Sequence, residues 1–318
     1  MKRRTMMIIG LIVVAMLIIV MGFFIVRNKT ESASESVTIH QNLQEDITLL
    51  KDIQYQVTDQ NNCYLDVAYK DDGKKKPLLI FVHGGSWSSG SKEDMNSLLY
   101  TFSALGYTTA SVNYDLLNML NALHGECISI TEEEACVSAA ADFLAGHAED
   151  YQIDTNKVVL IGHSSGGQLA GHLSEQIADH PENYPFQLKG AVLLAPASDL
   201  RYYVYNNIQI DGLELPLVEA SFIFDGVYGT DVFTEINKVD VLYNITQNLP
   251  PVLILHGSDD TSVPISLSEN LCNALEEKGV TAELTVIPGA THSLLEDETV
   301  FSEINRFLNQ YILNSKGE

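Results

Sequence analysis

The sequence predicts an α/β fold in which a mostly parallel, eight-stranded sheet carries helices on both faces. Apolar runs of strand length recur between residues 53 and 287, and most are followed by a segment with apolar residues at helical spacing. This alternation of strand and helix is typical of parallel sheets. One strand-to-helix junction reads Gly162-His163-Ser164-Ser165-Gly166. A G-x-S-x-G turn at such a junction lifts a serine hydroxyl clear of the sheet edge, which makes Ser164 a candidate nucleophile.

The composition is that of one large globular domain. The chain has 318 residues, of which 46% are apolar, so it can bury a large single core. The formal net charge of −24 argues against nucleic acid as a partner, because the phosphates would be repelled. We find no internal repeat and no second domain.

The N-terminal segment predicts a membrane anchor. Residues 6–26 form an uncharged apolar run that follows the basic stretch Lys2-Arg3-Arg4 and is long enough to cross a bilayer as a helix. The charges favour an N-terminus inside the cell and a folded domain outside it. A cleaved signal peptide is the alternative, although the run ends without a small-x-small cleavage site. We therefore expect three parts: a transmembrane signal-anchor over 1–29, a linker over 30–45 and the folded domain over 46–318.

The elements expected before the Ser164 turn are an edge hairpin followed by alternating strands and helices. The hairpin alternates apolar and polar residues around Asp59-Gln60-Asn61-Asn62, and the later runs are fully apolar, as in buried strands. Residues 115–132 have no clear period, so we expect them to lie over the site. The elements are strands at 53–57, 63–69 and 78–82, a helix at 98–105, a strand at 107–114, a helix at 135–148 and a strand at 158–160.

The same alternation continues after the Ser164 turn. Residues 201–240 interrupt it with an irregular, aromatic-rich stretch, which we interpret as a small cap or pocket wall. The remaining elements are strands at 190–196, 251–255 and 282–287, a helix that ends at Gly279 and a closing helix at 301–311.

The loop after the strand at 78–82 is rich in glycine and reads His83-Gly84-Gly85-Ser86-Trp87. Such a loop either ends a strand in a simple turn or brings backbone N–H groups close to a substrate oxygen, as in an oxyanion hole. We interpret His83 as a residue that braces the loop and not as a catalytic base. Trp87, the only tryptophan, is expected to pack the loop down, the alternative being that it lines the acyl pocket.

Two further loops supply candidates for a base and an acid. A serine hydroxyl needs a general base, and the base needs an acid that orients it. His292 follows the last strand and is the only histidine C-terminal to the candidate acids, so we expect it to be the base. Asp259 and Asp260 stand side by side after the strand at 251–255, and spacing alone does not separate them. The loops that follow parallel strands meet at one edge of the sheet, which would bring these residues to Ser164.

The four cysteines form neither a disulfide scaffold nor a metal-binding pattern. They are Cys63, Cys127, Cys136 and Cys272, without a C-x-x-C spacing. Cys127 and Cys136 lie close enough in sequence to form a disulfide in an exported domain, the alternative being four unpaired thiols. We expect no metal and no organic cofactor.

Four motifs occur in order, HGGSW at 83–87, GHSSGG at 162–167, HGSDD at 256–260 and GATH at 289–292. On these motifs the chain, from about residue 53 to 311, resembles the α/β-hydrolase superfamily. Within it the chain is similar to carboxylesterases with a His-Gly-Gly-x-Trp oxyanion motif, such as feruloyl and acetyl esterases and hormone-sensitive-lipase relatives.

The resemblance assigns roles to individual residues. It implies that Asp260 and not Asp259 is the acid. It implies oxyanion donors at the backbone N–H groups of Gly85 and Ser165, with Gly84 or Ser86 assisting. Cys136 departs from the family, which usually has an acidic residue near that position.

The implied activity is that of a serine carboxylesterase acting on small-acyl or carbohydrate esters. A prolyl-peptidase-like serine peptidase shares the order of the three residues and is one alternative. A non-catalytic surface protein on the same fold is the other. Labelling by a fluorophosphonate separates the enzymes from the surface protein, because it requires an activated serine.

Overall fold

The computed structural model describes residues 46–117, 128–205, 209–210, 213–214 and 231–313. The chain divides into two units, Met1–Asp46 and Ile47–Glu318, and the fold described below is that of the second. The anchor predicted at 6–26 and the linker predicted at 30–45 lie outside the described residues. In the part of the chain that the structure describes, no helix is long and apolar enough to cross a membrane.

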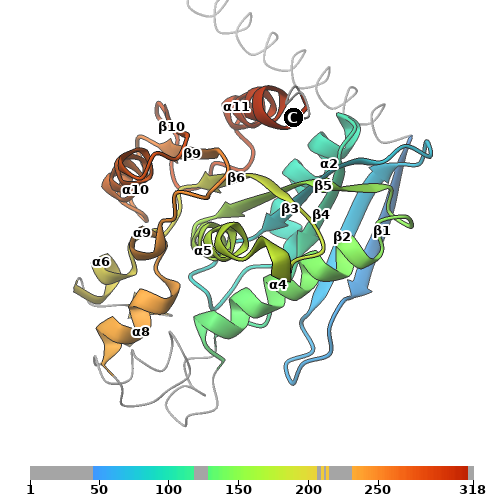
Figure 1. Ribbon diagram of the computed structural model, residues 1–318. Helices are drawn as coiled ribbons and strands as arrows, with labels where there is room; N and C mark the ends of the chain where they lie inside the picture. The colour runs from blue at the N-terminus through green and yellow to red at the C-terminus, as the bar shows by residue number, and fades with distance from the viewer. Residues whose placement is uncertain (1–45, 118–127, 206–208, 211–212, 215–230, 314–318) are drawn as a thin grey trace, which may run out of the picture. The chain divides into compact units, whose positions relative to one another are not determined.

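A single large sheet forms the centre of the second unit (Figure 1). Its order is β1-β2-β4-β3-β5-β6-β9-β10. β1 pairs with β2 and β2 with β4 in antiparallel fashion, and the other neighbours are parallel. The prediction of a mostly parallel, eight-stranded sheet is therefore confirmed. The strands are β1 (Ile47–Gln54), β2 (Tyr64–Lys70), β3 (Lys76–Val82), β4 (Thr108–Val112), β5 (Ile153–His163), β6 (Leu188–Leu194), β9 (Val252–Gly257) and β10 (Ala282–Ile287).

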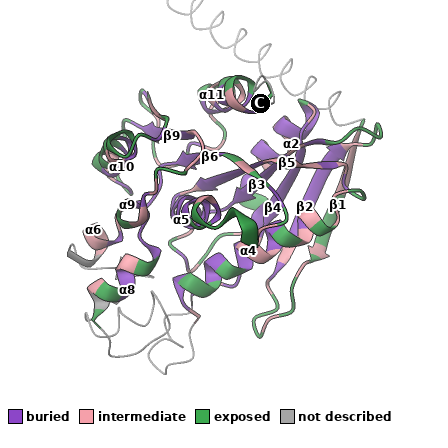
Figure 2. Cartoon of the chain, viewed as in Figure 1, coloured by how far each residue is buried: buried purple, intermediate pink, exposed green. Residues whose placement is uncertain are grey.

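Helices cover both faces of the sheet, because alternate residues of each strand point to opposite sides. Leu78, Ile80 and Val82 of β3 pack in one core with α4, α5 and α10, whereas Leu79 and Phe81 pack in a second core with α2 and α11. Figure 2 shows the central strands as largely buried, whereas the edge strands β1 and β10 consist mostly of intermediate or exposed residues. The helices are η1 (Lys92–Met95), α2 (Asn96–Ala104), α4 (Ile130–Gly146), α5 (Ser165–Asp179), η2 (Pro181–Asn183), α6 (Leu200–Tyr205), α8 (Val232–Val239), α9 (Val241–Asn244), α10 (Ile265–Glu277), α11 (Glu298–Leu308) and η3 (Asn309–Leu313).

The two stretches expected near the site are only partly described. Residues 118–127 of the first, and 206–208, 211–212 and 215–230 of the second, lie outside the described residues. The second contributes α6, α8 and a two-stranded hairpin of β7 (Gln209–Ile210) and β8 (Leu213–Glu214).

The prediction that a helix begins at residue 135 is wrong, because α4 begins at Ile130. Ser129 caps this helix. Its Oγ accepts a hydrogen bond from Glu132 N at 3.3 Å, and Glu132 Oε2 accepts one from Ser129 N at 2.6 Å. This reciprocal capping box satisfies donors that a helix start leaves unpaired. The irregular stretch predicted at 115–132 therefore ends before Ile130.

A buried lysine fixes the far end of the glycine-rich loop. Lys92 Nζ lies 2.9 Å from carboxylate oxygens of both Asp52 and Asp66, and 2.6 Å from Glu93 Oε1. Burial alone would lower the pKa of this amine, but the three carboxylates outweigh it and the pKa is raised. The cluster therefore ties η1 to β1 and β2, directly after the loop that follows β3.

Candidate active site

Ser164 lies in a strained turn between β5 and α5. Its φ is 56° and its ψ is −120°, a conformation that non-glycine residues rarely adopt. The turn depends on close backbone contacts. A Cβ on Gly162 would lie 2.1 Å from the carbonyl oxygen of Gly166, and a Cβ on Gly166 would lie 2.1 Å from that of His83. The glycines therefore allow β5, α5 and the loop after β3 to pack together around the serine.

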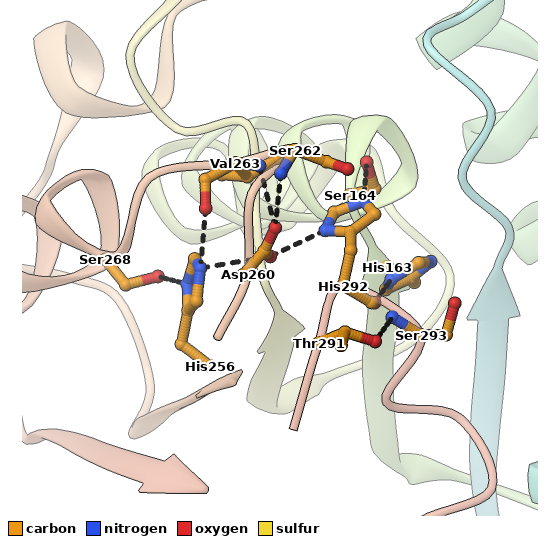
Figure 3. Close-up of polar contacts among 10 residues, drawn as sticks. All are labelled: His163, Ser164, His256, Asp260, Ser262, Val263, Ser268, Thr291, His292 and Ser293. Atoms are coloured by element: carbon orange, nitrogen blue, oxygen red, sulfur yellow. Dashed lines mark hydrogen bonds and ion pairs between the residues drawn. The ribbon is translucent and has the colours of Figure 1, made fainter. Parts of the chain in front are cut away.

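Ser164, His292 and Asp260 form a continuous chain of hydrogen bonds (Figure 3). His292 Nε2 lies 2.9 Å from Ser164 Oγ, and His292 Nδ1 lies 2.7 Å from Asp260 Oδ2. The three side chains come from loops at the carboxyl ends of β5, β10 and β9. Asp259 is exposed and accepts a hydrogen bond from Ser258. Of the two adjacent acids, the structure brings Asp260 to His292.

The carboxylate of Asp260 is held in its charged form. Its side chain is fully buried, and its Oδ1 accepts hydrogen bonds from Ser262 N at 2.8 Å and Val263 N at 2.9 Å. Burial opposes ionisation, but these N–H groups and His292 outweigh it and hold the pKa of Asp260 below its ordinary value. A carboxylate that stays ionised can stabilise a protonated His292.

Two more histidines brace these loops. His256 Nε2 donates to Val263 O at 2.9 Å, which leaves Nδ1 to accept from Ser268 Oγ at 2.6 Å. His163 Nε2 donates to the carbonyl oxygen of His292 at 2.9 Å. Burial and the neighbouring His292 lower the pKa of His163 to about 4, so His163 is neutral at neutral pH.

The glycine-rich loop packs directly against the nucleophile. A Cβ on Gly84 would lie 2.9 Å from Ser164 Cβ. The carbonyl oxygen of Gly85 closes the loop by accepting hydrogen bonds from Ser88 N at 3.2 Å and Ser89 N at 3.0 Å. Gly85 has a φ of 132°, which favours glycine. The loop therefore lies beside Ser164 in a conformation set by its own turn.

Several backbone N–H groups near Ser164 are available to a ligand. Within the described residues, those of Gly85, Ser86 and Ser165 donate none of the hydrogen bonds found. Ser165 opens α5, and the first N–H groups of a helix have no partner within it. The helix N-terminus also favours negative charge. These groups could therefore bind an oxygen that becomes negatively charged.

His83 braces the loop from within the protein. Its ring is fully buried and stacks on Tyr114 with the ring centroids 4.4 Å apart. Tyr114 OH donates to the His83 carbonyl oxygen at 2.8 Å, and His83 Nδ1 lies 2.8 Å from Gly84 O. Burial lowers the pKa of His83, which keeps the ring neutral. Its contacts are with Tyr114 and the Gly84 backbone, whereas the histidine that hydrogen-bonds to Ser164 Oγ is His292.

A second brace of the glycine-rich loop runs through Gln168, a residue that was not predicted from the sequence. Trp87 Nε1 donates to Gln168 Oε1 at 2.9 Å, and Gln168 Nε2 donates to Val239 O at 2.8 Å. Trp87 is buried, as expected, and also lines the cleft described below. The one signal in the sequence is that Gln168 is polar on a helix whose neighbouring positions are small or apolar.

A cleft of about 800 Å³ opens over Ser164 and His292. The loop after β3, the N-terminus of α5 and the segment around Tyr203 contribute to its walls. Its described lining includes the acidic residues Glu93, Asp94 and Glu296 and no lysine or arginine. Among the described residues, the group suited to holding a metal is Cys63, Asp115 and Cys136, none of which lines this cleft.

The fold and the arrangement of these loops define an α/β hydrolase. A family model described as BD-FAE matches residues 65–275. The chain therefore belongs to the BD-FAE family.

Several curated relatives are named as esterases. The chain is 26% identical over 246 residues to an isoprenylcysteine alpha-carbonyl methylesterase of Arabidopsis thaliana, covering 74% of this chain and 54% of the relative. It is 25% identical to esterase LipQ of Mycobacterium tuberculosis, covering 76% and 56%, and 26% identical to an acylamino-acid-releasing enzyme of Arabidopsis thaliana, covering 76% and 30%. The chain thus spans about half the length of the two esterases.

Solved structures share the fold. An inhibited esterase B from Lactobacillus rhamnosis superposes with a TM-score of 0.67 at 17% identity, covering 88% of this chain and 94% of that chain. A truncated carbohydrate esterase from gut microbiota superposes with a TM-score of 0.65 at 17% identity, covering 83% and 95%.

The lowered pKa of His163 predicts a pH-dependent stability. The unfolded chain takes up a proton at this histidine near pH 6.5, whereas the folded chain does so only near pH 4, so stability falls as the pH falls through that window. His163→Gln keeps a donor toward His292 O and removes the titration. Between about pH 7 and pH 4, we expect the variant to lose about 2–3 kcal/mol less unfolding free energy than the wild type, measured by urea titration. His180→Gln, at an exposed site, should match the wild type. Equal losses for all three proteins would contradict the assignment.

Proposed function

We propose that this protein is a serine carboxylesterase. The observation that carries the proposal is the hydrogen-bonded series Asp260–His292–Ser164, in which the serine lies on a strained turn beside a glycine-rich loop. The esterase names of several relatives support the same reaction class.

The proposed reaction has two halves. Ser164 Oγ attacks the ester carbonyl while His292 Nε2 takes its proton, and the buried carboxylate of Asp260 stabilises the resulting imidazolium. The N–H groups of Gly85 and Ser165, with Gly84 or Ser86 assisting, bind the oxyanion. His292 returns the proton to the alcohol as it leaves. A water, activated by the same histidine, then releases the acid from the acyl-enzyme.

Small-acyl or carbohydrate esters are the proposed substrates. The cleft is open, and its described walls mix hydroxyl groups with Trp87, Tyr203 and Leu295. Polar walls of this kind suit a hydroxyl-rich alcohol portion, and the fold neighbours include a carbohydrate esterase.

A serine peptidase is the second candidate, because relatives named acylamino-acid-releasing enzymes are about as similar as the esterases. The chain covers only 30% of those relatives. The same catalytic residues would serve both reactions, so the substrate separates the two candidates.

The catalytic assignment predicts graded losses of activity. On p-nitrophenyl acetate and butyrate, Ser164→Ala should reduce kcat by about 10⁵–10⁶-fold, and Asp260→Asn by about 10⁴-fold because His292 loses its orienting partner. Asp259→Asn is the matched control and should keep wild-type activity, since Asp259 is exposed and does not contact His292. Wild type and Asp259→Asn, but not Ser164→Ala, should be labelled by a fluorophosphonate. An unlabelled folded wild type would refute the proposal, and hydrolysis of N-acetyl amino-acid amides in preference to esters would establish the peptidase.

The acidic lining predicts selection by charge. Matched acetate esters with a trimethylammonium, a neutral tert-butyl or a sulfonate group on the alcohol should be hydrolysed with falling kcat/KM in that order. We expect a ratio of about 10 or more between cation and anion at low salt, and a smaller ratio at high salt. Glu296→Gln should reduce the ratio, whereas Glu269→Gln on α10, outside the cleft lining, should not. A preference for the sulfonate ester would show that the lining does not select charge.

We also propose that residues 6–26 anchor the chain in the cell membrane with the hydrolase domain outside the cell. The uncharged apolar run and the preceding basic residues support this placement. In a bacterial host, the full chain should sediment with membranes after a carbonate wash and require detergent for release. In intact cells with a permeabilised outer layer, protease should digest the hydrolase domain. A released chain that begins after residue 26 would instead establish a cleaved signal peptide.

A further inference from the structure

Two cysteines far apart in the sequence meet in the core. Cys63 lies directly before β2, and Cys136, which lies 73 positions further along the chain, is on α4. Their Sγ atoms are 3.5 Å apart, and both residues are buried. Cys127, the partner first considered for Cys136, lies outside the described residues.

We propose that Cys63 and Cys136 form a disulfide bond when the protein meets an oxidising environment. The bond requires Sγ atoms about 2.05 Å apart, so the two sulfurs need to approach by only about 1.5 Å. The proposal is independent of the esterase reaction, and neither cysteine lines the catalytic cleft.

The surroundings make the pair reactive. The hydrogen bond with Cys136 lowers the pKa of Cys63, burial opposes this, and a further hydrogen bond from Tyr55 contributes, which leaves the pKa at about 7. A thiol in that range supplies thiolate at neutral pH, whereas the same hydrogen bond and burial raise the pKa of Cys136, so Cys63 is the nucleophile of the pair. A separate cleft of about 250 Å³ opens beside the pair, lined by Asp115, Cys136 and Thr58 among others, and Thr58 Oγ1 lies 3.9 Å from Cys63 Sγ.

The oxidation balances with a small-molecule disulfide as the oxidant. The Cys63 thiolate attacks the oxidant, forming a mixed disulfide and releasing one thiolate, which takes the proton of Cys136. Cys136 Sγ then attacks Cys63 Sγ, which forms the Cys63–Cys136 bond and releases the second thiolate. The protein loses two electrons and two protons, and the oxidant is reduced to two thiols.

A metal site is less well supported than a disulfide. Cys63, Asp115 and Cys136 could each offer one ligand atom, and these atoms lie within 4.8 Å of one another. Structural zinc takes four ligands, and tetrahedral bonds of about 2.3 Å would keep two sulfurs roughly 3.8 Å apart. The group has three members among the described residues, its sulfurs are closer than that, and Asp115 Oδ1 already accepts from Asn62 N.

The bond would reinforce the support of the glycine-rich loop. Glu133, one turn before Cys136, accepts a hydrogen bond from Leu117 N, and the same N–H contacts Trp87 O at 3.0 Å. The N-terminal end of α4 therefore holds the segment on which this loop rests. Linking Cys136 to Cys63 would fasten that end of α4 to the sheet.

The test uses the full chain in detergent micelles, reduced with dithiothreitol or treated with oxidised glutathione. Peptide mapping under non-reducing conditions should recover the Cys63 and Cys136 peptides joined, lighter by two hydrogen atoms than their sum. Because the bond closes a long loop, the thermal midpoint of the oxidised protein should rise by roughly 10 °C and return after reduction.

Cys272→Ser is the matched control, because Cys272 is also a buried free thiol but lies on α10. It should keep the full shift, whereas Cys63→Ala and Cys136→Ala should lose it, with near-ultraviolet circular dichroism used to verify that they fold. The mapping of the unaltered protein decides the matter even where a variant fails to fold. Three outcomes would overturn the proposal. Cys136 could be joined to Cys127, both thiols could stay free after oxidation, or one equivalent of zinc could bind tightly and protect both sulfurs.

Discussion

The close approach of three backbone segments at Ser164 is the constraint on which the site depends. β5, α5 and the loop after β3 meet where Gly162 and Gly166 leave no room for a side chain. Without that contact, Ser164 could not be held at a positive φ, and the turn would relax into an ordinary strand end. The large parallel sheet matters because it supplies enough packing to maintain one strained residue.

The polar groups around this turn form a second layer of constraint. Asp260 is buried without loss of its charge, because backbone N–H groups and His292 compensate for the lost water. His256 lies beside Asp260 and His163 lies beside His292, both as neutral rings that hydrogen-bond to neighbouring backbone. Loops from separate strands are therefore held by a connected set of hydrogen bonds, which limits the movement of the His292 ring.

The sequence predicts the sheet and the order of the loops, because apolar periodicity and turn residues are local signals. It predicts less well the contacts between residues that lie far apart in the sequence. The choice of Asp260 over Asp259 rests on family spacing, and in the structure the distinction is one of burial and contact with His292. The start of α4 was within reach of sequence reasoning, since Ser129 and Glu132 have capping-box spacing. The approach of Cys63 to Cys136 was not, because no local pattern relates positions so far apart.

The loop after β3 differs from the serine turn in that two successive non-glycine residues of it have a positive φ. Ser86 and Trp87 follow Gly85 and have φ values of 52° and 61°, so two residues with side chains adopt the left-handed region in succession. Each such residue costs on the order of 1–3 kcal/mol. The turn bonds within the loop are joined by support from outside it, through the hydrogen bond from Trp87 to Gln168 and the one that the Trp87 carbonyl accepts from Leu117 N. Trp87 therefore has two roles: it helps to hold the backbone N–H groups of the loop in place, and it lines the cleft.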